Sequence, residues 1–144
     1  MRICGVELKG AEAILCLLDY EQGAFNVATC RQRVIAVSNS ESAQAMHDFR
    51  FAFDKLAEDY KIDQVVILER PQKGKFAGSA TSFKLEACLQ LSALAVSSLS
   101  SVDIKEMYKR NPLNVKPEDL GLKKFQAQAF AVAYAKHNKI IYEA

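Results

Sequence analysis

The sequence places a carboxylate directly after a short apolar run and follows it with a basic loop. Val65 to Leu68 is continuously apolar, Glu69 comes next, and a proline and two glycines then interrupt the chain. An apolar run of this kind predicts a central strand that is covered on both faces. The ends of such strands are where open α/β sheets commonly carry functional sites. Glu69 is therefore a candidate for chemistry at the end of a strand.

The segment after Glu69 has a composition that suits a phosphate backbone. From Arg70 to Lys84 it carries four positive residues and no acid. Its glycines permit close approach of a ligand to the backbone, and it leads into a predicted helix whose first N–H groups favour anions. The P-loop pattern G-x-x-x-x-G-K-[ST] is absent. The candidate phosphate-binding residues are Lys73, Gly74, Lys75, Gly78 and Ser79.

The same loop also has a purely structural interpretation. It can be a flexible surface segment in which Ser79 or Thr81 caps the next helix. Phe76, set among the lysines, either stacks on a base or packs into the core. A second basic cluster, diluted by acids, runs from Lys105 to Lys124 and either flanks the same cleft or forms a solvated surface.

The bulk composition is that of a single soluble domain. The 144 residues suffice for one core, half of them are apolar, and the formal net charge is +2. No apolar run approaches the roughly 20 residues that span a bilayer, and no secretory signal is visible, so a cytoplasmic location is expected. The four cysteines form no C-x-x-C pair and are expected to be reduced and mostly buried, without metal or disulfides.

The elements that must position these residues are five strands and three helices in one domain spanning residues 1–144. Three strands joined by tight glycine turns predict an antiparallel meander, and the later strands alternate with helices. The predicted strands are Arg2–Leu8, Ala13–Leu18, Phe25–Val37, Ile62–Glu69 and Val102–Tyr108. The predicted helices begin near Ser38, near Ser79 or Thr81, and at Lys123, and they end near Tyr60, Leu94 and His137.

Apolar spacing predicts how two of the helices pack. The first has apolar residues at steps of three and four, from Met46 to Tyr60, which indicates one stripe on a sheet, and Phe51 falls off this stripe. The helix Phe83–Leu94 is apolar around more than one face. It is therefore expected to be buried on two sides, and we expect a homodimer through it. His47 and His137 are interpreted as surface or helix-end residues.

This order of elements resembles the ribonuclease H-like fold, a mixed five-stranded sheet with helices on its faces. Local features resemble its RuvC-like branch, the Holliday-junction resolvases and their relatives. Ile3–Gly10 is similar to that family's first strand, which ends in an acid before a glycine turn. Val65–Glu69 is similar to the strand that delivers the second acid, and Lys123–Ala133 is similar to the last helix. The chain also resembles an uncharacterised bacterial family of this length.

The resemblance implies phosphodiester cleavage with bound Mg²⁺ or Mn²⁺, held by clustered carboxylates. By resemblance, Glu7 and Glu69 are the catalytic and metal-binding acids. The last helix of the family carries two further acids three residues apart, which here fall on Phe125 and Gln128, or alternatively on Gln126 and Ala129. Neither alignment supplies an acid, and Gln128 is the candidate for a neutral oxygen ligand. The implied metal site is therefore incomplete.

Two functions remain open from the sequence. The first is a ribonuclease H-like domain that engages DNA or RNA, as a divergent metal-dependent nuclease or as a binding protein without activity. The second is a protein-interaction domain on the same scaffold that acts as a homodimer. In a structural interpretation, Glu7 simply pairs with Lys9, and Glu69 pairs with Arg70 or Lys73.

Overall fold

The sheet combines an antiparallel first half with a parallel second half. In the computed structural model, which describes residues 1–143, β1 pairs antiparallel with β2, and β2 pairs antiparallel with both β3 and β4. β1 also pairs in parallel with β5, and β5 pairs in parallel with β6. The strands are β1 (Arg2–Lys9), β2 (Glu12–Glu21), β3 (Ala24–Val27), β4 (Val34–Ala36), β5 (Gln64–Leu68) and β6 (Ala95–Leu99).

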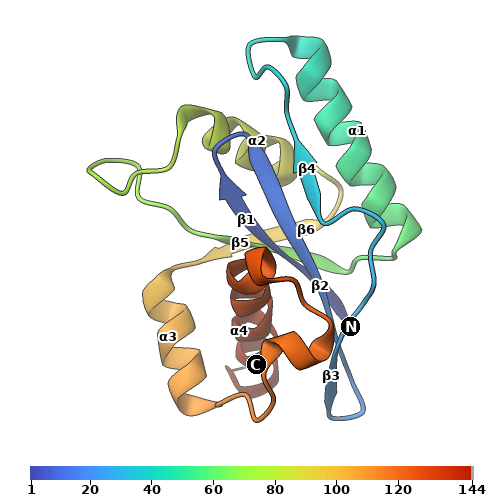
Figure 1. The fold of residues 1–144 in the computed structure, drawn as a ribbon, viewed down its shortest axis with the longest axis vertical. Helices are drawn as coiled ribbons and strands as arrows, with labels where there is room; N and C mark the ends of the chain where they lie inside the picture. The colour runs from blue at the N-terminus through green and yellow to red at the C-terminus, as the bar shows by residue number, and fades with distance from the viewer. Residues whose placement is uncertain (144) are drawn as a thin grey trace.

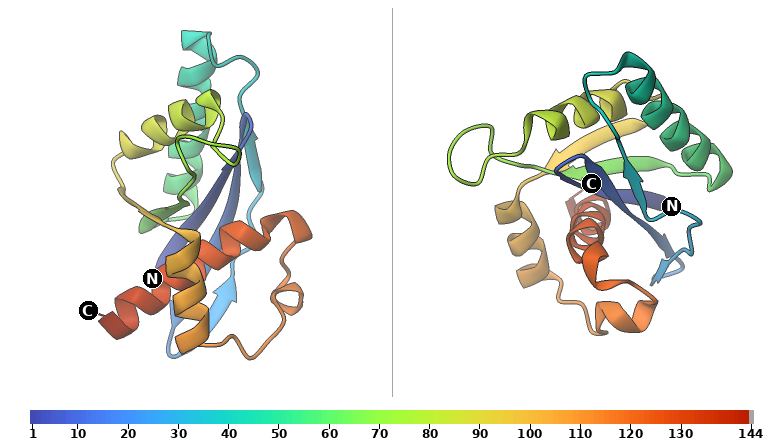
Figure 2. Two further views of the ribbon diagram at one scale, coloured as in Figure 1. Left: turned by 90° about the vertical axis from the view of Figure 1, so that its left-hand side faces the viewer. Right: turned by 45° about the horizontal axis from the view of Figure 1, so that its top comes forward.

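Helices cover both faces of this sheet (Figures 1 and 2). α1 and α2 lie on one face, and α3 and α4 lie on the other. Side chains of β1 alternate between the two faces, so Cys4, Val6 and Leu8 join the core under α1 and α2, whereas Ile3 joins the core under α4. The helices are α1 (Ala43–Asp59), α2 (Ala80–Gln90), α3 (Ser101–Arg110) and α4 (Ala127–Glu143), with short 3₁₀ turns η1 (Pro117–Leu120) and η2 (Lys124–Gln126).

The predicted α/β class with a mixed sheet is confirmed, but the described sheet has six strands rather than five. The predicted strand Phe25–Val37 is divided into β3 and β4, both paired with β2. The predicted strand Val102–Tyr108 is wrong, because this segment is α3. A capping box between Ser100 and Asp103 starts that helix, and its buried residues recur at helical spacing. The last strand is instead the serine-rich β6 at the edge of the sheet.

The three predicted helices are confirmed as α1, α2 and α4, with shifted bounds. Phe49, Phe53 and Leu56 of α1 are buried and Phe51 is 72% exposed, as the apolar spacing predicted. α2 ends at Gln90, earlier than predicted, which leaves Leu91 exposed. Dimerisation through Phe83–Leu94 stays a prediction. No helix within residues 1–143 combines the length and apolar character needed to cross a bilayer.

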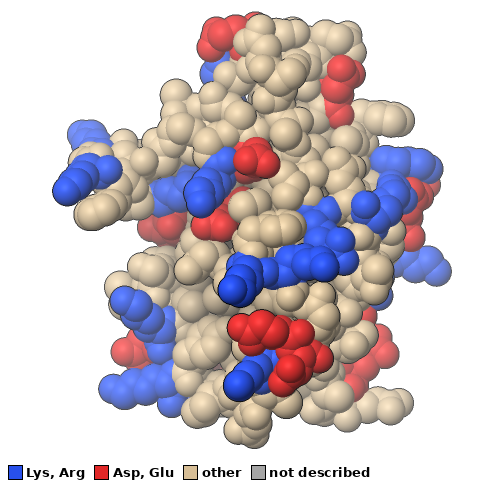
Figure 3. All heavy atoms as spheres, viewed as in Figure 1, with Lys and Arg blue, Asp and Glu red and all other residues tan. Residues whose placement is uncertain are grey.

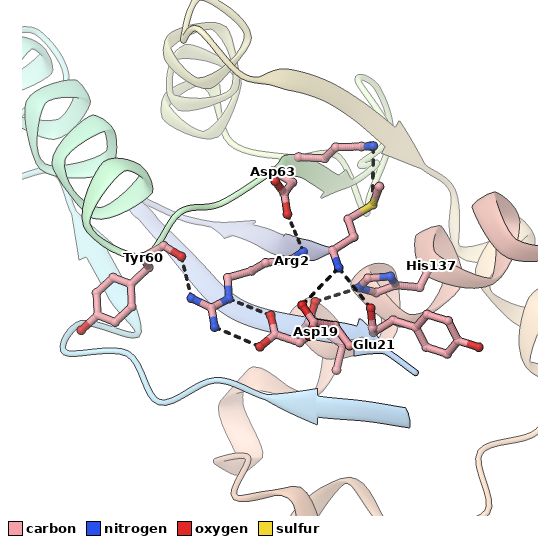
Figure 4. Close-up of polar contacts among 10 residues, drawn as sticks. Arg2, Asp19, Glu21, Tyr60, Asp63 and His137 are labelled. Atoms are coloured by element: carbon pink, nitrogen blue, oxygen red, sulfur yellow. Dashed lines mark hydrogen bonds and ion pairs between the residues drawn. The ribbon is translucent and has the colours of Figure 1, made fainter. Parts of the chain in front are cut away.

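Polar contacts fix the edge of the sheet where β1 begins (Figure 4). The Arg2 guanidinium donates two hydrogen bonds to Asp19, at 2.7 and 2.9 Å, and a third to the backbone carbonyl of Tyr60. The Arg2 backbone N–H donates to Asp63 at 2.7 Å. This network ties β1, β2 and the end of α1 together. The candidate residues lie at the opposite end of the sheet, where β1 and β5 finish.

The prediction that His137 is a surface residue is wrong. His137 is 2% exposed, and its Nε2 lies 2.7 Å from the Leu18 carbonyl oxygen (Figure 4). Its ring also packs near Phe25 and Tyr20. Burial lowers the pKa of His137, although the Leu18 carbonyl and Asp19 act in the opposite direction.

Acid is therefore expected to destabilise the protein through His137. The unfolded chain binds a proton at this residue below about pH 6.5, whereas the folded chain resists protonation, so unfolding becomes easier as pH falls through that range. Urea unfolding at a series of pH values should show a smaller loss of stability on acidification in His137→Gln than in the wild type. His47→Gln, at an exposed position on α1, is the control. If the free energy of unfolding of His137→Gln falls with pH as it does in the wild type, His137 is not the cause of the loss of stability in acid.

Candidate functional site

Glu7 lies near the end of the central strand, on the face that α4 covers. β1 alternates regularly, so Glu7 shares a face with Ile3 and Gly5. The side chain is half-buried, and this burial raises the pKa of Glu7, while Lys9 lowers it to a smaller extent. Glu7 and Lys9 form no ion pair in the described residues. A carboxylate at the rim of the core, free of a basic partner, is available to a ligand.

Glu69 lies at the same edge of the sheet. The parallel register pairs Val6 with Ile67, so Glu69, one residue past the end of β5, is level with Leu8 of β1. Its backbone N–H donates to the Leu99 carbonyl at 2.9 Å, and its side chain is exposed. The pairing of Glu69 with Arg70 that the structural interpretation offered does not occur. Arg70 instead forms an ion pair with Glu86 at 3.1 Å.

The third element at this edge is the N-terminal end of α4. α4 crosses β1 so closely that a Cβ on Gly5 would lie 2.0 Å from the Ala129 carbonyl oxygen. Gln126 is buried, its side-chain N–H donates to the Leu15 carbonyl at 2.8 Å, and its side-chain oxygen accepts from the Lys123 N–H at 2.9 Å. Gln128 is exposed on the first turn of α4. The helix therefore reaches the strand ends without bringing a carboxylate there.

The loop between β5 and α2 projects from this edge, at the left of Figure 1. Its neck is closed by a hydrogen bond of 2.9 Å from the Gly78 N–H to the Pro71 carbonyl. At its tip Gly74 has a φ of 95°, which favours glycine. Lys73 and Lys75 are exposed and have no ion-pair partner in residues 1–143. The loop therefore projects with positive charge at its tip, and hydrogen bonds fix the two ends that join it to β5 and α2.

Phe76 stands out from the tip of this loop. It is 80% exposed, with the Lys75 ammonium 5.8 Å from its ring centroid. Of the two alternatives for Phe76, packing into the core is therefore wrong. An exposed phenyl ring among cations is a surface on which a base can stack.

Two of the five predicted phosphate-binding residues, Gly78 and Ser79, contact residues outside the tip of the loop. A Cβ on Gly78 would lie 2.8 Å from Nε of Arg70, so this glycine allows the buried Arg70 to pack against the loop. The Ser79 hydroxyl caps α2 by accepting from the Ser82 N–H at 3.1 Å, and it donates to the Gly10 carbonyl at 3.0 Å. Ser79 thereby ties the loop to the β1–β2 turn. The helix-cap role that the structural interpretation gave to Ser79 is confirmed.

Positive side chains continue from the loop across one face of the molecule. Figure 3 shows Lys and Arg on the projecting loop and in a band across the middle of this face. A hollow beside the β1–β2 turn is lined by Lys9, Val34 and Phe125. A smaller hollow is lined by Arg33 and Gln126. Sequence reasoning did not select Lys9, Arg33 or Phe125 for binding, because they are far apart in the chain and only the fold makes them neighbours.

The side chains at this edge do not fit the two-metal centre that the resemblance implied. Hard divalent cations in such centres take several carboxylate ligands from different elements. Here two glutamates are available, and the helix supplies Phe125 and Gln128. No group of three or more His, Cys, Asp or Glu side chains within residues 1–143 is arranged to hold a metal ion.

Comparisons with solved structures show which known fold this is. RuvC from Thermus thermophilus superposes with a TM-score of 0.75 at 14% identity, over 99% of this chain and 97% of that chain. Thermus thermophilus RuvC in complex with a Holliday junction substrate gives 0.73 at 14% identity, over 97% and 94% of the two chains. The Fowlpox virus resolvase bound to Holliday junction DNA gives 0.51 at 12% identity, over 99% of each chain. The fold is therefore RuvC-like.

Sequence comparison matches the chain to a family model but to no curated protein. No curated protein matches the sequence. A family profile does match, and it covers residues 1–136 of the 144, so that every strand and most of the last helix lie inside the match. The chain therefore belongs to the family DUF3010, whose description is "Protein of unknown function".

Proposed function

We propose that this protein binds nucleic acid at the strand-end surface. This surface comprises the loop from Arg70 to Ser79, the ends of β1 and β5, and the N-terminal end of α4. The observation that carries the proposal is the exposed Lys73, Lys75 and Phe76 on a loop that Ser79 anchors to the β1–β2 turn. Lysines without ion-pair partners can neutralise phosphates and release the counterions condensed on the nucleic acid, and a base can stack on a neighbouring aromatic ring.

The RuvC-like fold supports DNA as the ligand class. Two of the structures similar to this chain are complexes with Holliday junction DNA. Their identities to this chain are 14% and 12%, so they support the proposal through the shared fold and not through shared residues. DNA is therefore the first ligand to test, and RNA is the second.

We also propose that Glu7 and Glu69, as acidic residues, and Gln128, as a neutral oxygen, belong to this surface and meet the bound backbone. Glu7 is half-buried with a raised pKa, and both side chains lack ion-pair partners among the described residues. A half-buried carboxylate with a raised pKa at a strand end, such as Glu7, is typical of functional sites. Because the carboxylate set is small and does not fit a two-metal centre, binding is the function proposed, and cleavage with Mg²⁺ or Mn²⁺ is an outcome that the test distinguishes.

The test is fluorescence anisotropy with a four-way DNA junction, a duplex and a single strand at low salt. We expect binding whose logarithm falls linearly with the logarithm of salt concentration, with a slope of about −0.7 to −0.9 per phosphate contact. The same mixtures with Mn²⁺ are then followed on denaturing gels. Cleavage that disappears in both Glu7→Gln and Glu69→Gln would assign nuclease activity. Absence of binding to all three DNAs and to single-stranded and duplex RNA would overturn the proposed function.

A further inference from the structure

The hollow beside the β1–β2 turn has the size and lining of a ligand site. Its volume is about 550 Å³, within the range of roughly 300–1,000 Å³ that small-molecule sites occupy. Phe125 from η2 forms one wall, and Gly10, Ile14 and Val34 from the β1–β2 turn, β2 and β4 contribute to the others. Phe125 is 49% exposed. One part of its ring therefore packs on the protein, and the rest faces the opening.

Buried hydrogen bonds hold Phe125 in this position. The next residue, Gln126, is 4% exposed and joins η2 to β2 through the Leu15 carbonyl. The same side chain closes η2 on itself by accepting from the Lys123 N–H. Displacing η2 would leave buried polar groups without partners, which is costly. The Phe125 ring is thus presented by a rigid support and does not have to be ordered when a ligand binds.

Positive charge surrounds the hollow. Lys9 lines it, Lys123 and Lys124 belong to the same turn as Phe125, and Arg33 precedes the lining residue Val34. None of these four cations has an ion-pair partner within residues 1–143. One acid, Glu12, lines the hollow opposite Lys9 in the strand register. The lining itself carries one cation and one acid, and the adjacent Arg33, Lys123 and Lys124 add the positive charge that suits a phosphate backbone.

We propose that the hollow takes one base of a single-stranded nucleic acid, which stacks on Phe125 while Lys9, Arg33 and Lys124 contact the flanking phosphates. This rests on the proposed function and specifies its ligand as unpaired strand. Gly10 lines the hollow and also accepts the hydrogen bond from Ser79, so the loop and the hollow adjoin at the β1–β2 turn. A strand held by the loop can pass over this turn into the hollow. A base must be unpaired to expose its face to Phe125.

The experiment measures anisotropy of a labelled oligothymidylate of about 15 nucleotides and of a duplex of equal length. Phe125→Ala is expected to weaken single-strand binding by at least about fivefold, because stacking on an aromatic residue contributes on this scale. Phe125→Trp is expected to retain or strengthen binding. Duplex binding should change less than twofold in either variant. Phe51→Ala, at an exposed phenylalanine of α1 on the other face of the sheet, is the matched control and should bind as the wild type.

The outcomes separate this inference from the proposed function. In one outcome, Phe125→Ala binds the single strand as tightly as the wild type while the loop variant Lys73→Glu/Lys75→Glu still loses binding. This result would overturn the proposed base site in the hollow and leave the proposed role of the loop standing. Equal losses for duplex and single strand would also overturn the base site. Absence of binding to any DNA or RNA overturns both proposals. Thermal unfolding of each variant shows whether the half-exposed Phe125 was replaced without loss of the fold.

Discussion

Gly5→Ala is expected to lower the free energy of unfolding by at least about 3 kcal/mol. A Cβ at this position would lie 2.0 Å from the Ala129 carbonyl oxygen and 2.8 Å from the Ala133 Cβ. The first contact is with helix backbone, so no side-chain rotation relieves it, and α4 would have to move away from the central strand. With typical stabilities of about 5–15 kcal/mol, the loss is a large fraction of the total. Urea unfolding measures it directly.

Two variants show whether the close crossing of β1 and α4 is the cause. Gly23→Ala changes a glycine with a φ of 81° and nothing near its missing Cβ, so only backbone strain of about 1–2 kcal/mol is expected. Gly5→Ala combined with Ala133→Gly removes the contact with the Ala133 side chain but keeps the contact with the Ala129 carbonyl. This double variant should remain as unstable as Gly5→Ala. A cost for Gly5→Ala no larger than that of Gly23→Ala would contradict the packing described.

Reversing the charges of the loop, Lys73→Glu with Lys75→Glu, is expected to reduce DNA affinity at low salt by at least about tenfold. Both ammonium groups are exposed and lack ion-pair partners within residues 1–143, so their loss removes phosphate contacts and adds repulsion. The slope of log affinity against log salt should become shallower by about 1.4–1.8, which corresponds to two contacts. Stability should change little, since the tip of the loop packs on nothing.

The matched control changes the same number of charges at the other edge of the sheet. Lys61→Glu with Lys139→Glu alters an exposed lysine before β5 and another near the end of α4. The net charge of the protein becomes the same as in the loop variant. If binding depends on the strand-end surface, this control should keep most of the affinity and the full salt slope. Equal losses in the two double variants would mean that overall charge, not the loop, decides binding.

The fold class could be predicted from the sequence because its signals are local. The glycine turns after Lys9 and Glu21 indicated the meander, and continuous apolar residues indicated the central β5. The error at the last strand has a physical reason. β6 is short and serine-rich, and it becomes a strand because β5 offers an edge for parallel pairing. The residues after it carry a capping box, which favours the helix that they form.

The candidate site likewise has one part that could be predicted from the sequence and another part that could not. The strand-end glutamates and the basic loop were visible because each lies within one short stretch of sequence. The hollow was not visible, because Lys9, Val34 and Phe125 come from three distant segments. The buried Gln126 was weighed as a ligand position on the last helix. The structure shows that it is a structural residue whose partners are the Leu15 carbonyl and the Lys123 N–H.

The sequence by itself determined the order of the elements, the meander before the crossovers, and the absence of acids at the first turn of the last helix. Each of these follows from neighbouring residues, through turn preferences, apolar spacing and residue identity. Only the tertiary structure decided that Arg70 pairs with Glu86 and not with Glu69, that His137 is buried, and that Phe125 adjoins Lys9. Such contacts join segments brought together by the burial of two cores, and the burial energy is a property of the whole packed chain.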